Sequence, residues 1–285
     1  MEILWEHRGV FVPPNKGTYF FTKHYGMGLP WYEGFFSGSA SRITGEVCEG
    51  YLASPEALAR IREYRPDMRI ICCLRNPYER AISSWRFFAR NGEDQPTLVA
   101  QAERNPDVFE FGYYATQLQV VLSLFPRDQI LVILFEELTT APEKVAQRVY
   151  EFIGADPQFV PQCLRQRVNP SGRPRSRRLA HIVHVLHMRA WGSSRLTAKV
   201  VGSVKRIGLI RRAIRKLLYD ERPHSGKWPD LMAEFPQEVI KRYEQEISSL
   251  EQMLQRNLSS WRAPIGVDDD ATYSLSQRRT VGLGD

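Results

Sequence analysis

The sequence has few cysteines and no long apolar run. Cysteine accounts for 4 of 285 residues, and Cys48, Cys72, Cys73 and Cys163 do not stand at metal-ligand spacing. No apolar run reaches transmembrane length, and no apolar segment of the kind found in signal peptides follows the first residues. These absences predict a cytoplasmic protein with reduced thiols, in which the adjacent Cys72 and Cys73 belong to the core.

The sequence also lacks internal repeats and any composition shift that would mark a second domain. Apolar residues make up 43% of the chain, which is enough for a sizeable core. We therefore expect one domain over residues 1–264, followed by a disordered tail over residues 265–285. The net charge of +7 fits an anionic ligand, a nucleic acid or an acidic surface.

The most informative stretch is a short apolar run followed by a helical pattern. Residues 69–74 predict a buried strand of a parallel sheet. Asn76 then suits an N-cap, and Pro77 suits the first helical position. Apolar residues recur at helical spacing from Ala81 to Ala89. The stretch therefore predicts a strand, a tight turn and a helix.

This turn is a candidate anion site. Arg75 stands at the carboxyl end of the predicted strand, where α/β sheets bind ligands, and its planar guanidinium suits a phosphate. We expect free backbone N–H groups and the positive end of the helix dipole at the same place. Ser83, two turns into the helix, supplies a hydroxyl. An arginine at a strand end is also commonly just a solvated charge.

The spacing of Arg75, Pro77, Arg80 and Ser83, followed by Trp85, resembles a known motif. It is similar to the 3′-phosphate-binding motif of sulfotransferases that use 3′-phosphoadenosine 5′-phosphosulfate (PAPS), the sulfuryl donor. The resemblance implies that Arg75 and Ser83 hold the 3′-phosphate of PAPS. It also implies a P-loop-NTPase-like sulfotransferase fold. Alternation of strands and helices likewise predicts a three-layer α/β/α domain around a central, mostly parallel sheet.

An upstream segment resembles the bacterial and heparan-sulfate-type members of the same family. It contains Lys16, the pair Phe20-Phe21, and the run Gly28-Leu29-Pro30-Trp31-Tyr32. The resemblance implies that Lys16 faces the sulfuryl group and that Trp31 and Tyr32 border the acceptor. Aromatic residues this dense also fit simple core packing.

The chain departs from the family in two respects. The acid that usually follows the lysine, and that takes the acceptor proton, is replaced by Gly17. His24 is the nearest titratable substitute, with a pKa suited to a base near neutrality, and Glu46 is a second choice. The family's N-terminal strand and 5′-phosphosulfate loop have no counterpart before Val10.

Three interpretations of the missing loop stay open. The chain is a piece whose true start lies upstream, or it binds nucleotide without efficient transfer. Alternatively, Lys16, Gly17 and Thr18 themselves form the loop. We favour the first. The expected reaction is transfer of a sulfuryl group from PAPS to a hydroxyl or amine of a glycan or small-molecule acceptor, without a metal.

Basic segments in the second half of the sequence suggest an alternative function. The loop Arg165–Arg178 contains Arg173 and Arg175, which the resemblance makes candidates for PAPS contacts. With the basic helix predicted over Lys205–Lys216, this loop also fits a nucleic-acid or other anionic partner on a catalytically impaired scaffold. Three histidines at 181, 184 and 187 lack a companion carboxylate, so we expect no metal there.

Overall fold

The computed structural model describes residues 1–13, 17–93, 95–165, 173–174, 176, 178–179, 181–182, 219–220 and 231–262. The α-helices are α1 (Glu2–Glu6), α2 (Leu29–Glu33), α3 (Pro55–Tyr64), α4 (Pro77–Arg90), α5 (Leu98–Arg104), α6 (Asp107–Glu110), α7 (Tyr114–Leu124), α8 (Phe135–Thr140), α9 (Pro142–Ile153) and α13 (Gln237–Leu254). The 3-10 helices are η1 (Tyr25–Met27), η2 (Gly34–Phe36), η3 (Arg127–Gln129), η4 (Gln162–Arg165), η5 (Leu231–Glu234) and η6 (Ser259–Trp261). The strands are β1 (Val10–Phe11), β2 (Ile43–Thr44), β3 (Ile70–Leu74), β4 (Ile130–Leu134), β5 (Arg173–Pro174) and β6 (Tyr219–Asp220).

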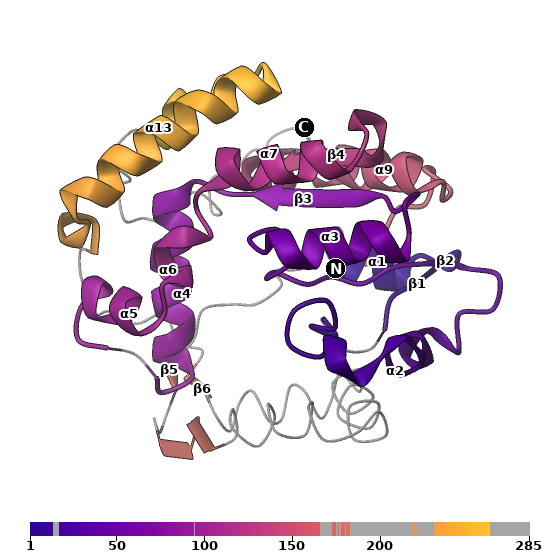
Figure 1. Cartoon of the computed structure of the whole chain (residues 1–285), viewed down its shortest axis with the longest axis horizontal. Helices are drawn as coiled ribbons and strands as arrows, with labels where there is room; N and C mark the ends of the chain where they lie inside the picture. Colours follow the sequence, from indigo (N-terminus) through magenta and orange to yellow (C-terminus); the bar gives the residue numbers. More distant parts are fainter. Residues whose placement is uncertain are drawn as a thin grey trace, which may run out of the picture.

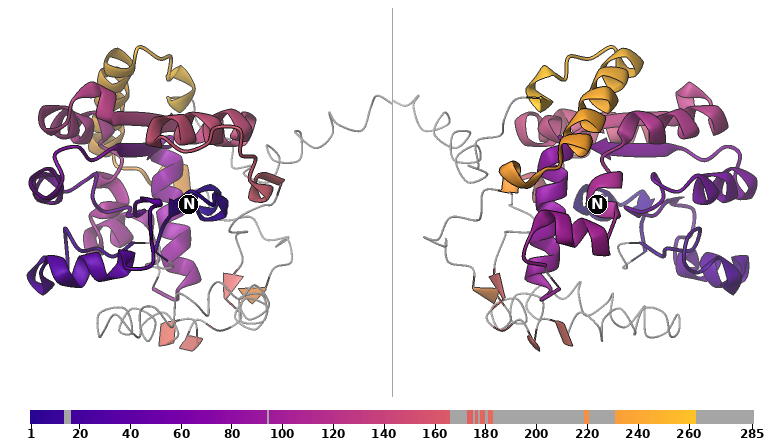
Figure 2. Two further views of the ribbon diagram at one scale, coloured as in Figure 1. Left: turned by 90° about the vertical axis from the view of Figure 1, so that its right-hand side faces the viewer. Right: turned by 60° about the vertical axis from the view of Figure 1, so that its left-hand side comes forward.

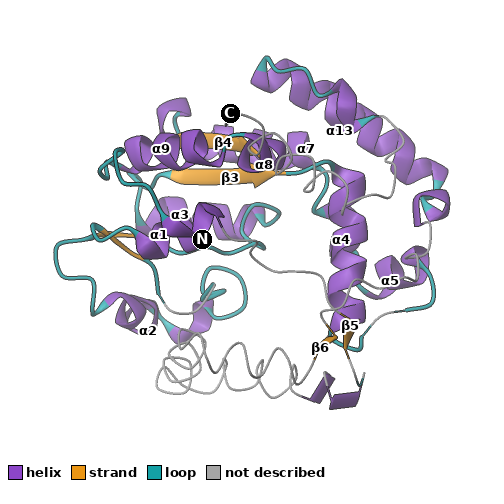
Figure 3. Cartoon of the chain, turned by 180° about the vertical axis from the view of Figure 1, so that it is seen from behind, coloured by secondary structure: helices purple, strands orange, loops and turns teal. Residues whose placement is uncertain are grey.

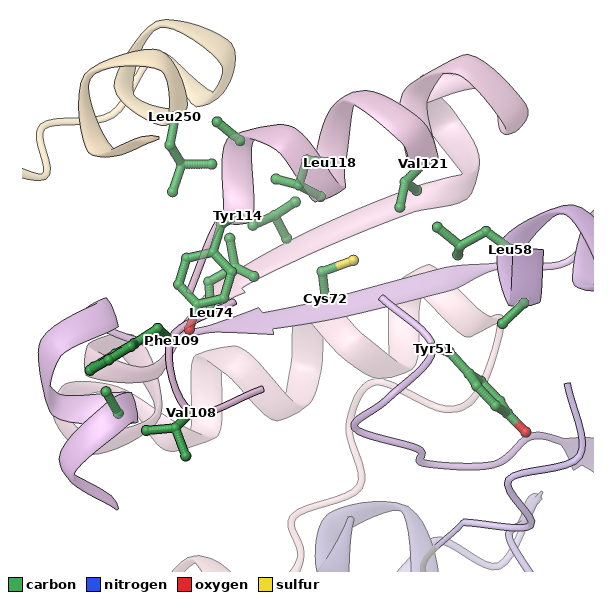
Figure 4. Close-up of a cluster of buried hydrophobic side chains, with 14 of the residues drawn as sticks. Tyr51, Leu58, Cys72, Leu74, Val108, Phe109, Tyr114, Leu118, Val121 and Leu250 are labelled. Atoms are coloured by element: carbon green, nitrogen blue, oxygen red, sulfur yellow. The ribbon is translucent and has the colours of Figure 1, made fainter. Parts of the chain in front are cut away.

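The β3–β4 pair is parallel and carries helices on both of its faces (Figure 1). Cys72 and Leu74 of β3 belong to the main apolar core, which α7 shares through Leu118 and Val121 (Figure 4). On the opposite face, Ile133 of β4 packs with residues of α9 in a second apolar cluster. The predicted α/β class and the layering around buried strands are therefore present.

The sheet itself is smaller than the sequence predicts. Among the described residues, β3 pairs only with β4, β1 pairs in parallel with β2, and β5 pairs antiparallel with β6. Figure 3 shows these short strands among many helices. β1 and β2 have two residues each. They form a small separate ladder that is not part of the β3–β4 sheet.

Cys73 is exposed, so the prediction that both adjacent cysteines lie in the core is wrong for this one. Side chains alternate across a strand, which places Ile71 and Cys73 on the face opposite Cys72. That face is covered by α9 over β4, whereas Ile71 remains 36% exposed. The apolar run predicts a strand that is buried on both faces, whereas in the structure only one face of β3 is buried.

Residues with strong capping preferences stand at the helix ends. The Ser54 hydroxyl oxygen caps α3 by accepting from the Ala57 N–H. Gly154 ends α9 in the left-handed conformation at φ +81°, which is typical of a glycine after a helix. α13 ends at Leu254, where Gln255 takes a left-handed conformation at φ +52°.

The helix α13 completes the main apolar core. α13 packs against α7 (Figure 2) through a buried stripe of Val239, Tyr243, Ile247 and Leu250. The Tyr243 hydroxyl donates to the Phe109 carbonyl over 3.0 Å, which ties α13 to α6. Among the described residues, no helix is both long enough and apolar enough to span a membrane.

Candidate functional site

The turn after β3 carries Arg75 as predicted, and the structure shows what holds its side chain. Arg75 Nε donates to Glu79 Oε2 over 2.8 Å, and its guanidinium lies 4.8 Å from the centre of the Phe135 ring. Glu79 belongs to the first turn of α4, and Phe135 directly follows β4. The Arg75 side chain keeps 20% of its surface exposed. A cation is thus held at the carboxyl ends of both parallel strands.

The helix start beside Arg75 is capped by its own side chain. Asn76 Oδ1 accepts from the N–H groups of Tyr78 and Glu79 over 3.0 and 3.4 Å, and Pro77 has no N–H. The expectation of free backbone N–H groups at this turn is therefore wrong, because the N-cap that starts the helix also consumes them. The helix dipole and Arg75 remain as the attractions for an anion.

Trp261 of η6 fixes this capped turn from the far end of the chain. Asn76 Nδ2 donates to the Trp261 carbonyl over 3.2 Å, and Trp261 Nε1 donates to Glu136 Oε1 over 3.0 Å. Asn76 is 3% exposed and Trp261 is 2% exposed. The turn is therefore held rigidly from three elements: the start of α4, the start of α8 and η6.

The other members of the predicted motif lie along α4. Ser83 is exposed on the second turn, four residues after Glu79 and therefore on the same face of the helix as the Arg75–Glu79 pair. Arg80 turns elsewhere, since its guanidinium donates to the Val108 carbonyl and ties α4 to α6. The structure thus gives Arg80 a packing role and leaves Arg75 and Ser83 as the pair for an anion.

A partly buried carboxylate, Glu137, lies at the same strand ends. Burial raises the pKa of Glu137, but the Leu134 N–H, Arg148 and Arg256 outweigh it and hold this pKa below its ordinary value. Arg148 Nη1 and Arg256 Nη1 reach the Glu137 carboxylate over 2.7 and 3.0 Å. Glu137 is therefore a charged structural anchor for the end of β4.

The aromatic segment predicted to border an acceptor is largely core. Trp31 and Tyr32 of α2 are 9% and 5% exposed. The Phe20 ring stacks on Tyr32 with centroids 4.7 Å apart, and Phe21 meets the same ring edge-on at 5.0 Å. The packing interpretation thus accounts for most of this cluster. Exposed apolar surface comes instead from Tyr25, Met27 and Leu29, which are 36%, 52% and 40% exposed.

His24 lies at the rim of this cluster, partly exposed. Its ring centre is 5.5 Å from that of Trp31. Burial lowers the pKa of His24, and the nearby Lys23 lowers it further. No hydrogen bond from the described residues engages its ring nitrogens. A neutral imidazole with an open lone pair is the state that a proton acceptor near neutral pH requires.

Glu46 is the polar centre of the same region. Its Oε2 accepts from the Thr18 N–H and from Thr18 Oγ1, each over 2.8 Å. Its Oε1 accepts from the Tyr51 hydroxyl over 2.8 Å and from the Tyr32 hydroxyl over 3.2 Å. Burial raises the pKa of Glu46, although these four donors oppose the shift.

Gly17 is confined by its neighbours. A Cβ added there would lie 2.9 Å from the Val47 carbonyl oxygen and 3.2 Å from Cys48. The backbone of Gly17 therefore approaches residues 47–48 more closely than any side chain would allow. This explains physically why an acid at position 17 does not fit the present fold.

Three predicted residues cannot be placed in this geometry. Lys16 and Arg175 lie outside the described residues, and only the backbone of Arg173, in β5, is described. Of the predicted site residues, the structure brings together His24, Trp31 and Tyr32, whereas Arg75 contacts Glu79 and Phe135, and Ser83 lies farther along α4. Within the described ranges, no cluster of histidine, cysteine or carboxylate side chains could hold a metal.

Comparison with known families identifies the region that holds the Arg75 turn. Residues 52–170 match the model of a family described as "Sulfotransferase domain". The chain carries a sulfotransferase domain. Over its matched half it is a distant homologue of heparan sulfate sulfotransferases. It is 30% identical over 177 residues to mouse heparan sulfate glucosamine 3-O-sulfotransferase 6, covering 55% of this chain and 52% of that protein.

Two further comparisons extend this sulfotransferase relationship. The chain is 29% identical over 159 residues to human bifunctional heparan sulfate N-deacetylase/N-sulfotransferase 3, covering 50% of this chain and 18% of that protein. The chain thus spans about half or less of the length of these curated relatives. A crystal structure of a sulfotransferase from Alicyclobacillus acidocaldarius shares the fold, with a TM-score of 0.61, 21% identity and 92% coverage of both chains.

Sequence reasoning missed the residues that orient the candidates. Glu79 was detectable, because an acid four residues from an arginine is a standard helical ion pair. Phe135 and Trp261 contact the turn from 60 or more residues away in the chain, so no local pattern pointed to them. Glu46 was named only as a second-choice base, and its role as acceptor of four hydrogen bonds follows from the fold alone.

Proposed function

We propose that this sulfotransferase-domain protein moves a sulfuryl group from PAPS to a hydroxyl or amine acceptor. The observation that carries the proposal is the Arg75 turn: a partly exposed guanidinium at the carboxyl ends of β3 and β4, held by Glu79 and Phe135. It lies inside the segment that matches the sulfotransferase domain. In this proposal Arg75 and Ser83 bind the 3′-phosphate of PAPS.

His24 is the proposed proton acceptor. During transfer, the bond from sulfur to the donor's phosphate oxygen breaks, and a bond from sulfur to the acceptor oxygen or nitrogen forms. The acceptor's proton passes to the open imidazole nitrogen of His24. Because burial and Lys23 lower the pKa of His24, the ring is neutral at pH 7 and can accept that proton.

The acceptor lies, in this proposal, against the exposed residues of η1 and the start of α2. Trp31 and Tyr32 support that surface from beneath, since both are nearly buried. Lys16 is proposed to face the sulfuryl group, and Arg173 and Arg175 to contact PAPS. The curated relatives carry heparan sulfate in their names, so a glycan is one acceptor class to test beside small hydroxyl and amine compounds.

The proposal is tested by thermal unfolding with 3′-phosphoadenosine 5′-phosphate (PAP), the product left after transfer. Ligand at a hundred times its dissociation constant stabilises the native state by about 2.7 kcal/mol. We expect a clear rise in Tm for the wild-type protein and for Arg65→Ala, which removes an exposed arginine paired with Asp67. Arg75→Ala should reduce the rise to less than about half, because it weakens PAP binding roughly 10- to 150-fold.

The same titration with single-stranded RNA and DNA tests the alternative of a nucleic-acid-binding protein. Of the basic segments that suggested it, the 205–216 segment lies outside the described residues and the 165–178 loop is described only in part. A shift with RNA or DNA and none with PAP would contradict the enzyme proposal. Transfer of labelled sulfate from PAPS to a panel of glycans and phenols then tests the reaction directly.

A further inference from the structure

Glu46 connects the two chain segments that surround His24. One segment, residues 17–21, precedes His24, and the other is α2, which carries Trp31 and Tyr32. Four donors reach the Glu46 carboxylate from Thr18, Tyr32 and Tyr51. Since a carboxylate has about four lone-pair positions, these donors fill its hydrogen-bonding capacity.

The network extends past the carboxylate to the backbone. Thr18 Oγ1 accepts from the Phe20 N–H over 3.2 Å, and the Tyr51 hydroxyl oxygen accepts from the Phe21 N–H over 3.4 Å. The rings of Phe20 and Phe21 in turn pack on Tyr32. Glu46 therefore orders the backbone on one side of the aromatic cluster and the α2 hydroxyl on the other.

His24 depends on the elements that this network holds. It follows Phe21 by three residues, and its backbone N–H donates to the Tyr19 carbonyl over 3.1 Å. Its ring packs beside Trp31, the neighbour of Tyr32 on α2. Any movement of α2 or of residues 18–21 would change how far the imidazole is buried.

We infer that Glu46 is a positioning residue for the His24 site and is not itself the base. A base needs a vacant lone pair, and at least one of the four donors would have to leave before Glu46 could take a proton. This inference rests on the proposed function for its catalytic meaning, although the structural dependence can be measured without PAPS or an acceptor.

Three variants separate the parts of the network. Glu46→Gln retains one oxygen for Thr18 but removes the charge, and the two tyrosine hydroxyls can then only accept from its amide, so the charge-assisted bond that holds α2 is weakened. Tyr32→Phe removes only the bond between α2 and Glu46. Glu46→Ala removes all four bonds. Glu49→Gln is the matched control, because Glu49 is an exposed acid nearby whose carboxylate accepts from the Tyr19 hydroxyl.

The readout is the pKa of His24, followed by NMR of the imidazole protons and assigned with His24→Gln. The wild-type value lies below 6.5. We expect Glu46→Gln and Tyr32→Phe to raise it toward 6.5 and Glu49→Gln to leave it unchanged. PAP binding should be unaffected in all of them, since Arg75 lies on another element.

An unchanged His24 pKa in folded Glu46→Gln and Tyr32→Phe proteins would overturn the inference, whatever Glu46→Ala does to folding. If the wild-type protein does not bind PAP, the proposed function is contradicted. The titration of His24 would then remain an independent test of the network. With an acceptor identified, Glu46→Gln should lower kcat, because a displaced His24 accepts the proton less well.

Discussion

Replacing Asn76 by alanine tests how the turn that carries Arg75 is built. The substitution removes the cap on α4, which is worth about 1 kcal/mol, and the buried bond to the Trp261 carbonyl, worth about 1 kcal/mol more. Asn76 is 3% exposed, so water cannot replace either bond fully. The expected loss of unfolding free energy is about 2 kcal/mol, or roughly 4–8 °C in Tm for a domain of 150–250 residues.

Urea unfolding followed by circular dichroism measures this loss. Asn76→Ser is the matched control, because serine keeps a capping oxygen but cannot reach Trp261. It should lose about half as much as alanine. Two results would refute the reasoning: an alanine variant within 0.5 kcal/mol of wild type, or a serine variant as unstable as alanine.

Three further predictions concern other parts of the molecule. Gly112→Ala should destabilise the protein by about 1–3 kcal/mol, because the added Cβ would lie 2.9 Å from the Tyr243 ring; thermal unfolding measures it, and an unchanged Tm would contradict it. Alkylation with peptide mapping should label Cys73 before Cys72. Cys73 is exposed, whereas Cys72 is buried and burial raises the pKa of its thiol to about 12. Equal labelling rates would contradict the exposure of the Cys73 face of β3. The pKa of His24 is lower in the folded than in the unfolded state. The unfolded state therefore binds more protons, and the free energy of unfolding should fall as the pH drops below about 6.5. Urea unfolding of His24→Gln should show a weaker dependence of this free energy on pH, and an identical dependence would contradict the assignment.

Local structure was predictable because its causes are local. Asn76 before Pro77, Ser54 before Pro55 and Gly154 after an amphipathic run each specify a helix end through bonds to residues within one turn. Arg75 could be named from its position after an apolar run. The resemblance to sulfotransferases suggested PAPS as the ligand, which no local pattern contains.

What could not be predicted depends on contacts distant in sequence. Strand pairing joins residues 60 positions apart, as in Ile70 with Ile130, and a short apolar run does not reveal which of its faces is covered. Asn76 meets Trp261 across 185 positions. The mistake about free N–H groups has a simpler cause: the residue that marks the helix start also satisfies its donors.

The central claim is that Arg75 recognises a phosphate on the 3′ position of the donor nucleotide. Calorimetric titration with PAP and with adenosine 5′-phosphate, which lacks that group, measures it directly in wild-type and Arg75→Ala proteins. Hydrogen bonds to charged groups contribute about 1.5–3 kcal/mol, so wild type should prefer PAP by roughly 10- to 150-fold and the variant should bind both nucleotides alike. An equal preference for PAP in both proteins would contradict the claim.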